Sequence, residues 1–311
     1  MFDILFCPFN GLGDKFLDII GACVLCDLLN KKLHINLNTN NQNFVFGSGR
    51  YDASLFNINN ISISNNNDVK YNNILISENP SVSLSPIKIF NYLNNEKKMN
   101  ISYETILHKF RENARNIKPS VDIEKYIPKD IHNAYGIHLR ATDKIFTNKG
   151  DARHETEAYA HNIIITNLLN DITNIIINED KPMFFLASED KQWKENIKTK
   201  IINIGNTCNK NIIFINYSED SLSNIEGFHS VLDLFSLSRC KRIYQGIKYS
   251  TYSILASLIG NIELVNYANH INGYDMCIIH IWKPLFIPFI ITQNIEDADY
   301  AAKPFTNLII K

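Results

Sequence analysis

The sequence lacks an excess of charge of either sign. Its 31 Lys and Arg residues are balanced by 32 Asp and Glu residues, so the formal net charge at pH 7 is −1. A protein that binds the phosphate backbone of a nucleic acid needs a basic surface to displace condensed counterions. We therefore expect no nucleic-acid partner for this chain.

Cysteine is scarce and scattered. The six cysteines are Cys7, Cys23, Cys26, Cys208, Cys240 and Cys277. One pair has CxxC spacing, but no second pair and no histidine cluster completes a zinc site. The same spacing fits one face of a buried helix, so packed, reduced thiols are the favoured interpretation. We expect a cytoplasmic redox environment and no bound metal.

Long apolar runs are also missing. Residues 1–15 have no basic region and no cleavage site of small residues, so they predict a first strand and not a signal peptide. The most apolar late segment, CIIHIWKPLFIPFIIT, is interrupted by Lys283, Pro284 and Pro288. It is too short and too broken to cross a bilayer. We expect no transmembrane segment and a cytoplasmic location.

The pattern of apolar residues predicts an α/β fold. Residues 2–7 form a strand, residues 15–29 have helical periodicity, and residues 32–38 form a second strand. Residues 85–118 favour helices, and the proline-containing segment 117–131 favours a linker. The second half then alternates short apolar strands with longer helical segments. This predicts two Rossmann-like domains, residues 1–125 and 126–311, that face each other across a cleft.

Polar residues follow the predicted strands of the second half. In open α/β sheets the ligand binds beyond the carboxyl ends of the strands, so these positions are the candidate site. Arg140 follows the strand YGIHL, and its forked guanidinium suits the oxygens of a diphosphate. A scaffold ion pair with Asp143 or Asp190 would explain it equally well.

Two helix starts are further candidates. Ser250 and Thr251 open the segment STYSILASLIG, where capping alone would explain them, although the same helix end also suits an anion. Gly11 and Gly13 lie in the first turn, GLGDK, which is neither a complete GxGxxG fingerprint nor a Walker loop. A tight turn would explain these two glycines without a ligand.

Four segments together resemble the fucosyltransferases. HLRATDK resembles the His-x-Arg-Arg-Thr-Asp-Lys motif of α-1,6-fucosyltransferases, and His154 with EAYAHNI resembles its continuation. FFLASED resembles the strand that ends in Ala-Thr-Asp-Asp, and VLDLFSLSRC followed by YSTYS resembles the Asp-x-x-x-Leu-Ser helix and Ser-Ser turn. NGLGDKFLDIIGA resembles the Gly-Leu-Gly-Asp start of the rhizobial nodulation and α-1,2 enzymes. The resemblance covers the second half and the start of the first.

This resemblance implies a two-domain glycosyltransferase of B type that inverts the anomeric carbon without a divalent metal or other cofactor. Residues 126–311 would bind a nucleotide-sugar donor, GDP-fucose above all, and residues 1–125 would hold a carbohydrate or glycolipid acceptor. Arg140 would neutralise the departing β-phosphate in place of a metal. Asp143 is the favoured general base, and Asp151 and Glu155 are the alternatives.

The resemblance also implies a set of donor-binding residues. They are Gly11, Gly13, His138, Lys144, Glu189, Asp190, Asp233, Ser250, Thr251 and Tyr252. Plainer interpretations stay open: His138 would be satisfied by a backbone carbonyl, Asp233 would be a solvated helix carboxylate, and Glu189 with Asp190 would simply start a helix. Ser238 is expected beside Asp233, near the nucleotide.

Two departures from the family pattern keep other functions open. The second arginine of the motif is Ala141 here, and the segment 146–153 is longer than in α-1,6 enzymes. The alternatives are a B-type transferase with another nucleotide-sugar donor and an inactive glycan-binding relative. An NAD-dependent oxidoreductase is a more distant alternative, because the glycine fingerprint is incomplete.

Overall fold

The structure is a computed structural model of the chain. It describes residues 2–6, 8, 11–37, 53–58, 61–64, 70–76, 84–140, 152–217, 225, 227–247, 250–267, 285, 289–291 and 309–310. No helix within these ranges is both long enough and apolar enough to cross a membrane.

The first half is built on a five-stranded sheet with the order β13-β5-β1-β2-β4. The first strands and the helix between them are β1 (Phe2–Phe6), α1 (Leu12–Leu28) and β2 (Leu33–Asn36), followed by β4 (Ser62–Ser64) and β5 (Tyr71–Ile76). These four strands are parallel, whereas β13 (Ile309–Ile310) is antiparallel to β5. The end of the chain therefore returns to the first sheet.

Short elements surround this sheet and lead to the second half. They are the 3₁₀ turn η1 (Ala53–Leu55), β3 (Phe56–Ile58), α2 (Pro86–Asn91), the π-helical turn η2 (Tyr92–Glu96), α3 (Tyr103–Arg115), β6 (Ile117–Pro119), α4 (Val121–Tyr126) and the 3₁₀ turn η3 (Ile131–Asn133). Strands β3 and β6 form an antiparallel pair. Ser102 and Ser120 cap α3 and α4, because each side chain accepts a hydrogen bond from a backbone N–H of the first turn.

The second half has a parallel six-stranded sheet with the order β12-β11-β10-β7-β8-β9. Its elements are β7 (Tyr135–Leu139), α6 (Ala152–Asn178), β8 (Met183–Ser188), α7 (Lys191–Thr207), β9 (Ile213–Phe214), α8 (Phe228–Leu237), β10 (Arg242–Gln245), α9 (Thr251–Gly260), β11 (Leu264–Asn266) and β12 (Phe289–Ile291). The strands are almost wholly apolar because both faces of the sheet are covered by helices.

Alternate residues of these strands enter two different cores. Phe184 and Leu186 of β8 pack with Ile164, Leu168 and other residues of α6 and α7 on one face. Phe185 of β8 and its neighbour Ala187 belong to the core on the opposite face, which contains α8 and α9. This division arises because successive side chains of a strand point to opposite faces of the sheet. It also determines which polar side chains face α9.

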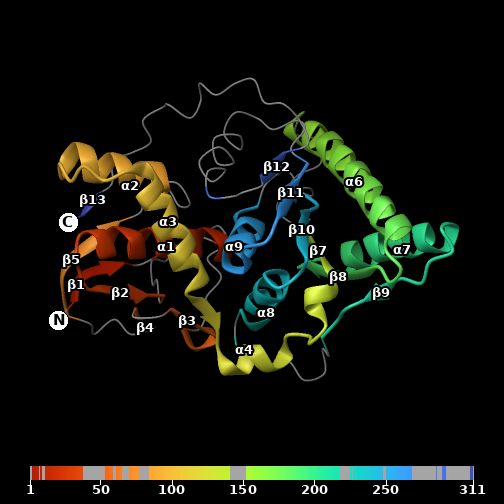
Figure 1. The fold of residues 1–311 in the computed structure, drawn as a ribbon, viewed down its shortest axis with the longest axis horizontal. Coiled ribbons are helices and arrows are strands. Elements are labelled where there is room, and N and C mark those ends of the chain that lie inside the picture. The colour runs from red at the N-terminus through yellow and green to blue at the C-terminus, as the bar shows by residue number, and fades with distance from the viewer. Residues whose placement is uncertain are drawn as a thin grey trace.

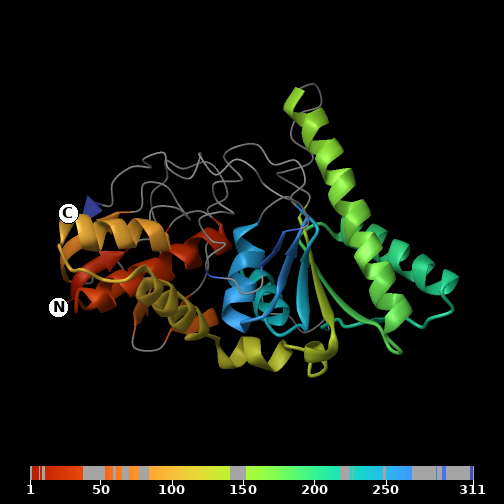
Figure 2. The ribbon, with the colours of Figure 1, turned by 45° about the horizontal axis from the view of Figure 1, so that its top comes forward.

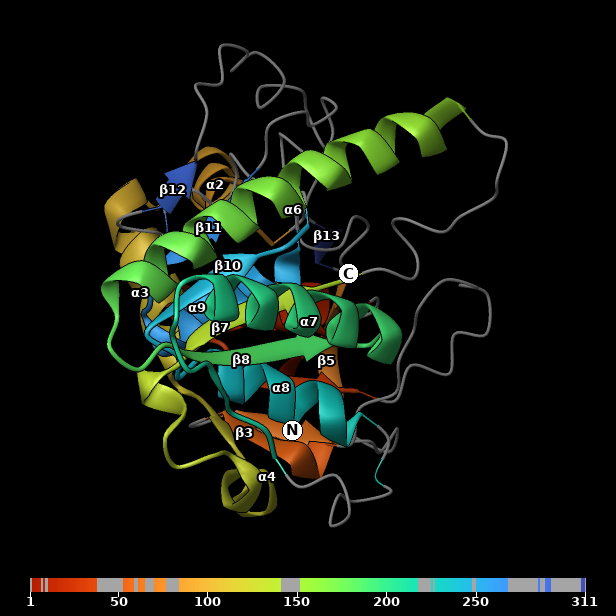
Figure 3. The same ribbon diagram turned by 90° about the vertical axis from the view of Figure 1, so that its right-hand side faces the viewer.

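The two halves share the larger core. Figure 1 shows α8 and α9 between the two sheets, with α1 and α3 on the other side of α9. Apolar residues of all four helices form one continuous cluster. Figure 3 views the second sheet from the side that α6 and α7 cover, and Figure 2 shows the start of α6 extending beyond the sheet. The first half is thus packed directly against the helix that follows β10.

The predicted α/β architecture is confirmed, with a mostly parallel sheet in each half and differences of detail. Helix α1 begins at Leu12 and not at Lys15, so Gly13 lies in the first helical turn. Strand β5 was missed because its sequence, YNNILI, has a polar middle, and segment 117–131 holds a strand and a helix rather than a plain linker. Residues 309–310, which the predicted boundary places in the second domain, extend the first sheet.

The two cysteines with CxxC spacing pack as the helical pattern predicted. Cys23 and Cys26 lie on α1 and belong to the large core, with exposed fractions of 3% and 2%. Burial raises the pKa of the Cys26 thiol to about 12, and it raises the pKa of Cys23 as well. Both thiols therefore stay protonated at neutral pH, as inert core residues do.

Candidate functional site

The first turn of α9 lies against the first turn of α1, so the starts of two helices from the two halves converge. A Cβ atom added to Gly13 would lie 2.4 Å from the backbone nitrogen of Tyr252 and 2.7 Å from Thr251 Oγ1. Only glycine allows this approach. A Cβ at Gly11 would meet nothing within 4 Å. The structure therefore gives a steric reason for the second glycine of the GLGDK segment and none for the first.

Ser250 precedes α9 but does not cap it. Its side chain makes no capping hydrogen bond, and its Oγ atom is buried without a hydrogen-bond partner. The favoured interpretation of Ser250 as a side-chain cap is therefore wrong. The first N–H groups of a helix have no acceptor within the helix. A buried hydroxyl at the start of a helix, where the helix dipole places partial positive charge, forms an environment that suits an anion.

His138 joins strand β7 to the same helix turn. Its Nδ1 atom and Ser253 Oγ share a hydrogen bond of 2.6 Å, and its ring lies 4.9 Å from the ring of Tyr252. Burial, together with the charge of Arg140, lowers the pKa of His138 to about 3. The imidazole is therefore neutral at physiological pH and holds α9 through a side chain, not through the backbone carbonyl of the plainer interpretation.

Arg140 follows β7 at the carboxyl edge of the sheet. Its Nε atom lies 3.9 Å from Glu189 Oε1, and the two side chains are 35% and 42% exposed. Glu189 is not one of the two residues that the sequence suggested for a scaffold pair, and of those two Asp143 lies outside the described residues. A pair of this length and exposure is weak and easily replaced. Arg140 thus places a partly exposed guanidinium at the carboxyl edge of the sheet, beside His138.

A second polar group lies beyond β8 and β9. Tyr217 donates a hydrogen bond of 2.7 Å to Asp233 Oδ1, and Lys194 lies 6.0 Å from the centre of the Tyr217 ring. Burial above all, with a smaller effect of the Glu189 charge, raises the pKa of the Asp233 carboxyl to about 6, against the opposing effects of Tyr217 and Lys194. Asp233 is thus a partly buried hydrogen-bond acceptor and not a solvated carboxylate.

Two predicted residues have structural roles. The Asp190 side chain accepts a hydrogen bond of 2.8 Å from the backbone N–H of Trp193, so it caps α7 as the plainer interpretation proposed. Ser238 was expected near the nucleotide, and this is wrong. It ends α8 at the opposite edge of the sheet, where its hydroxyl donates to the carbonyl of Phe235 and its backbone meets Gly260 at the end of α9.

The remaining predicted residues cannot be placed around this edge. Asp143, Lys144 and Asp151 lie outside the described residues, as does Ala141. Glu155 belongs to α6, but its side chain is also outside the described part. Within the described ranges, no three His, Cys, Asp or Glu side chains come together as metal ligands.

Sequence reasoning missed three polar residues at this edge. Gln245 ends β10, Asn266 ends β11, and Tyr217 follows β9. The first two are almost fully buried and contact each other. Each interrupts an apolar strand at its last position, RIYQ and ELVN, which is the signal that could have identified them.

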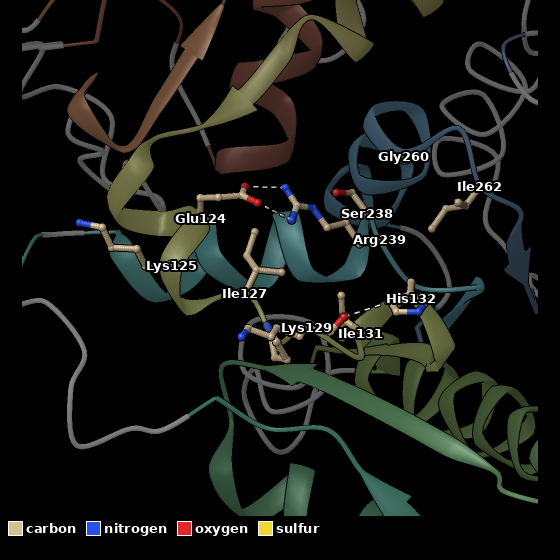
Figure 4. A pocket seen from close by; sticks show the side chains of 11 residues that line it. Glu124, Lys125, Ile127, Lys129, Ile131, His132, Ser238, Arg239, Gly260 and Ile262 are labelled. Atoms are coloured by element: carbon tan, nitrogen blue, oxygen red, sulfur yellow. Dashed lines mark hydrogen bonds and ion pairs between the residues drawn. The ribbon is translucent and has the colours of Figure 1, made fainter.

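A pocket of about 680 Å³ lies at the other edge of the second sheet (Figure 4). Residues 124–132 and the ends of α8 and α9 line it, and an ion pair crosses it, in which both terminal nitrogens of Arg239 donate to the Glu124 carboxylate at 2.8 and 2.6 Å. It lies where α8 and α9 end, so it is separate from the site at their starts. Its Arg239 provides a control position for Arg140.

No family model matches the chain, and no curated protein matches it in sequence. Solved structures share its fold. The fucosyltransferase NodZ from Bradyrhizobium matches with a TM-score of 0.51 and 14% identity over 85% of this chain and 94% of that one. NodZ alpha-1,6-fucosyltransferase co-crystallized with GDP matches with a TM-score of 0.50 and 14% identity over 86% of this chain and 95% of that one. The resemblance read from the motifs is thus confirmed at the level of the fold.

Proposed function

We propose that this chain is a glycosyltransferase that transfers a sugar from a GDP-sugar to a hydroxyl of a glycan or glycolipid, and that this sugar is fucose. The observation that carries the proposal is that Arg140 lies near the start of α9, a helix that the Ser250 side chain does not cap. Arg140 lies next to His138, and His138 is bonded to the first turn of α9. A guanidinium and a row of backbone N–H groups around one point suit a diphosphate.

The fold supports this assignment. A structure that shares this fold, NodZ alpha-1,6-fucosyltransferase, was co-crystallized with GDP. In doubly wound sheets the nucleotide binds beyond the carboxyl ends of the strands, which is where Arg140, Glu189 and the start of α9 lie. Asp233 would accept a hydrogen bond from the base, because its carboxylate is partly buried and held by Tyr217.

The reaction would be a single displacement at the anomeric carbon. The acceptor oxygen forms a bond to that carbon, the bond from the carbon to the β-phosphate oxygen breaks, and GDP leaves with the bonding electrons. The acceptor proton passes to a carboxylate, for which Asp143 is our first choice and Asp151 and Glu155 are the alternatives. Arg140 stabilises the charge that develops on the leaving oxygen.

We further propose that this step needs no divalent metal, because Arg140 and the N–H groups of α9 supply positive charge at the leaving phosphate. Residues 126–311 would carry the donor site, and the first half would contribute Gly13 and the acceptor surface. We expect the reaction in the cytoplasm, where the thiols of Cys23 and Cys26 stay reduced.

Replacement of Arg140 tests the proposal. Arg140→Ala should lower the rate of donor hydrolysis or transfer by about 10²–10³-fold, as the removal of one donor to a developing oxyanion does. Arg239→Ala is the matched control, because it removes an arginine of similar exposure at the far edge of the sheet. Its rate should stay within about twofold of the unmodified protein, since surface ion pairs contribute little.

Calorimetric titration with GDP, UDP and GDP-fucose identifies the donor. Binding of GDP and GDP-fucose without UDP supports the proposal, and preference for UDP would indicate another donor class. Equal rates in Arg140→Ala and Arg239→Ala would contradict the assignment of Arg140. Donor binding with no turnover toward any acceptor or water would favour an inactive glycan-binding relative, in line with Ala141.

A further inference from the structure

Three neighbouring strands of the second sheet carry a buried polar side chain at the same level. They are His138 in β7, Gln245 in β10 and Asn266 in β11, and the register places Gln245 opposite both of the others. Their exposed fractions are 4%, 1% and 1%. Residues in register point to the same face of the sheet, and the bond from His138 to Ser253 shows that this face carries α9.

Buried amides cost free energy unless they are hydrogen-bonded, so their partners indicate what they do. Asn266 Nδ2 donates to Gln245 Oε1 at 2.7 Å, and Gln245 Nε2 donates to the backbone carbonyl of Ser250 at 3.4 Å. The same carbonyl accepts the first helical hydrogen bond of α9, from the N–H of Ile254 at 3.2 Å. A chain of side-chain bonds thus runs from β11 through β10 to the start of α9.

The donor and acceptor roles in this series of hydrogen bonds are fixed. A backbone carbonyl can only accept, so Gln245 must turn its Nε2 atom toward Ser250. Its Oε1 atom then faces Asn266, which must donate. A reversed amide would place two oxygens against each other at the start of α9.

We propose that Gln245 and Asn266 are positioning residues, which fix the first turn of α9 so that its N–H groups bind the diphosphate. This inference rests on the proposed function and deepens it. Gln245 holds Ser250, while His138 holds Ser253 one turn further on. Gly13 lies against the opposite side of the turn. Ser250, whose buried hydroxyl has no partner, is the residue at which Gln245 acts.

Two substitutions disrupt this series of hydrogen bonds in different ways. Gln245→Met keeps the length of the side chain but removes both bonds. Asn266→Asp replaces a donor with an acceptor, so the Gln245 amide must turn and present its oxygen to the carbonyl of Ser250. We expect the dissociation constants for GDP and for inorganic pyrophosphate to rise about tenfold in both, because the donors of a preorganised site are displaced.

The pH dependence separates positioning from loss of stability. A protonated carboxyl can donate as an amide does, so Asn266→Asp should recover affinity for pyrophosphate, relative to the unmodified protein, as the pH is lowered toward about 5. Gln245→Met has no group that titrates and should show no such recovery. Thermal unfolding of each variant verifies that it is folded under the conditions of the titration.

Ser257→Ala is the control within the same helix. Ser257 Oγ donates to the carbonyl of Ile262 at the far end of α9, so its loss should lower the unfolding midpoint and leave pyrophosphate affinity unchanged. The inference is overturned if Gln245→Met and Asn266→Asp bind pyrophosphate as tightly as the unmodified protein. If so, the proposed function still stands, provided that Arg140→Ala weakens the binding of pyrophosphate. If the unmodified protein binds neither GDP nor pyrophosphate, both are overturned.

Discussion

Gly13→Ala tests the contact between the two halves, which the whole site requires. A methyl group at this position would lie 2.4 Å from the backbone nitrogen of Tyr252 and 2.6 Å from the backbone carbon of Thr251. Ordinary contacts of such an atom begin at 3.4 Å, so α1 and α9 would have to separate by about 1 Å. The two nearest atoms that it meets are backbone atoms, which no side-chain rotation can move away.

Two effects of opposite sign decide the result. Gly13 has helical backbone angles within α1, so alanine would by itself stabilise the helix by about 1 kcal/mol. Overpacking of a close contact costs about 1–3 kcal/mol, and a rigid backbone on the other side places the cost at the upper end. We expect a net loss of about 1–2 kcal/mol in the free energy of unfolding, together with weaker GDP binding because the first turn of α9 moves.

Urea unfolding and calorimetric titration with GDP measure the two consequences. Gly11→Ala is the matched control, because an added methyl group there meets nothing within 4 Å and the φ angle is −65°. Gly11→Ala should lower the free energy of unfolding by less than about 1 kcal/mol, because neither glycine nor alanine has a side chain that can cap the helix. If Gly13→Ala proved as stable as Gly11→Ala and bound GDP equally well, the packing of α1 on α9 described above would be wrong.

Three further changes test other parts of the site. Ser250→Ala should not lower the unfolding free energy in urea titrations, because its buried hydroxyl makes no bond to lose and its removal ends a desolvation cost, and a loss above about 1 kcal/mol would show that it caps α9 after all. At pH values above 6, Asp233→Asn should raise the midpoint temperature of thermal unfolding, whereas at pH 4 it should not. The pKa of the Asp233 carboxyl is about 6 in the folded state against an ordinary 3.8, so the folded state loses stability as the pH rises through that window. An equal change at both pH values would exclude a raised pKa. EDTA should leave the rate of donor hydrolysis unchanged. A loss of that rate that Mn²⁺ restores would refute the metal-free mechanism.

Local sequence patterns determined the elements and their order. Apolar strands such as YGIHL and MFFLAS, separated by helical segments, specify a parallel sheet that is covered on both faces, and β7 and β8 follow that pattern. Placing the site at the carboxyl ends of the strands also came from the sequence, since the fold class alone determines that edge. Helix and strand periodicities are properties of neighbouring residues, which is why a single sequence carries them.

Contacts between distant residues were decided only by the tertiary structure. Gly13 meets Thr251 and Tyr252, which lie more than two hundred positions further along the chain, and no local pattern encodes that pairing. The sequence marked Ser250 as a cap, but whether a serine caps a helix depends on its own backbone conformation and its surroundings in the fold, and here its side chain makes no capping bond.

The roles of Gln245 and Asn266 have the same origin. The sequence shows only a polar residue at the end of each apolar strand. The register of β10 and β11 places the two amides side by side, and the position of α9 supplies the carbonyl that gives them a direction. The sequence determined which chemical groups stand at the strand ends. The packing of the sheet and its helices decided which of them contact each other, because hydrogen bonds require positions that the chain reaches only when it is folded.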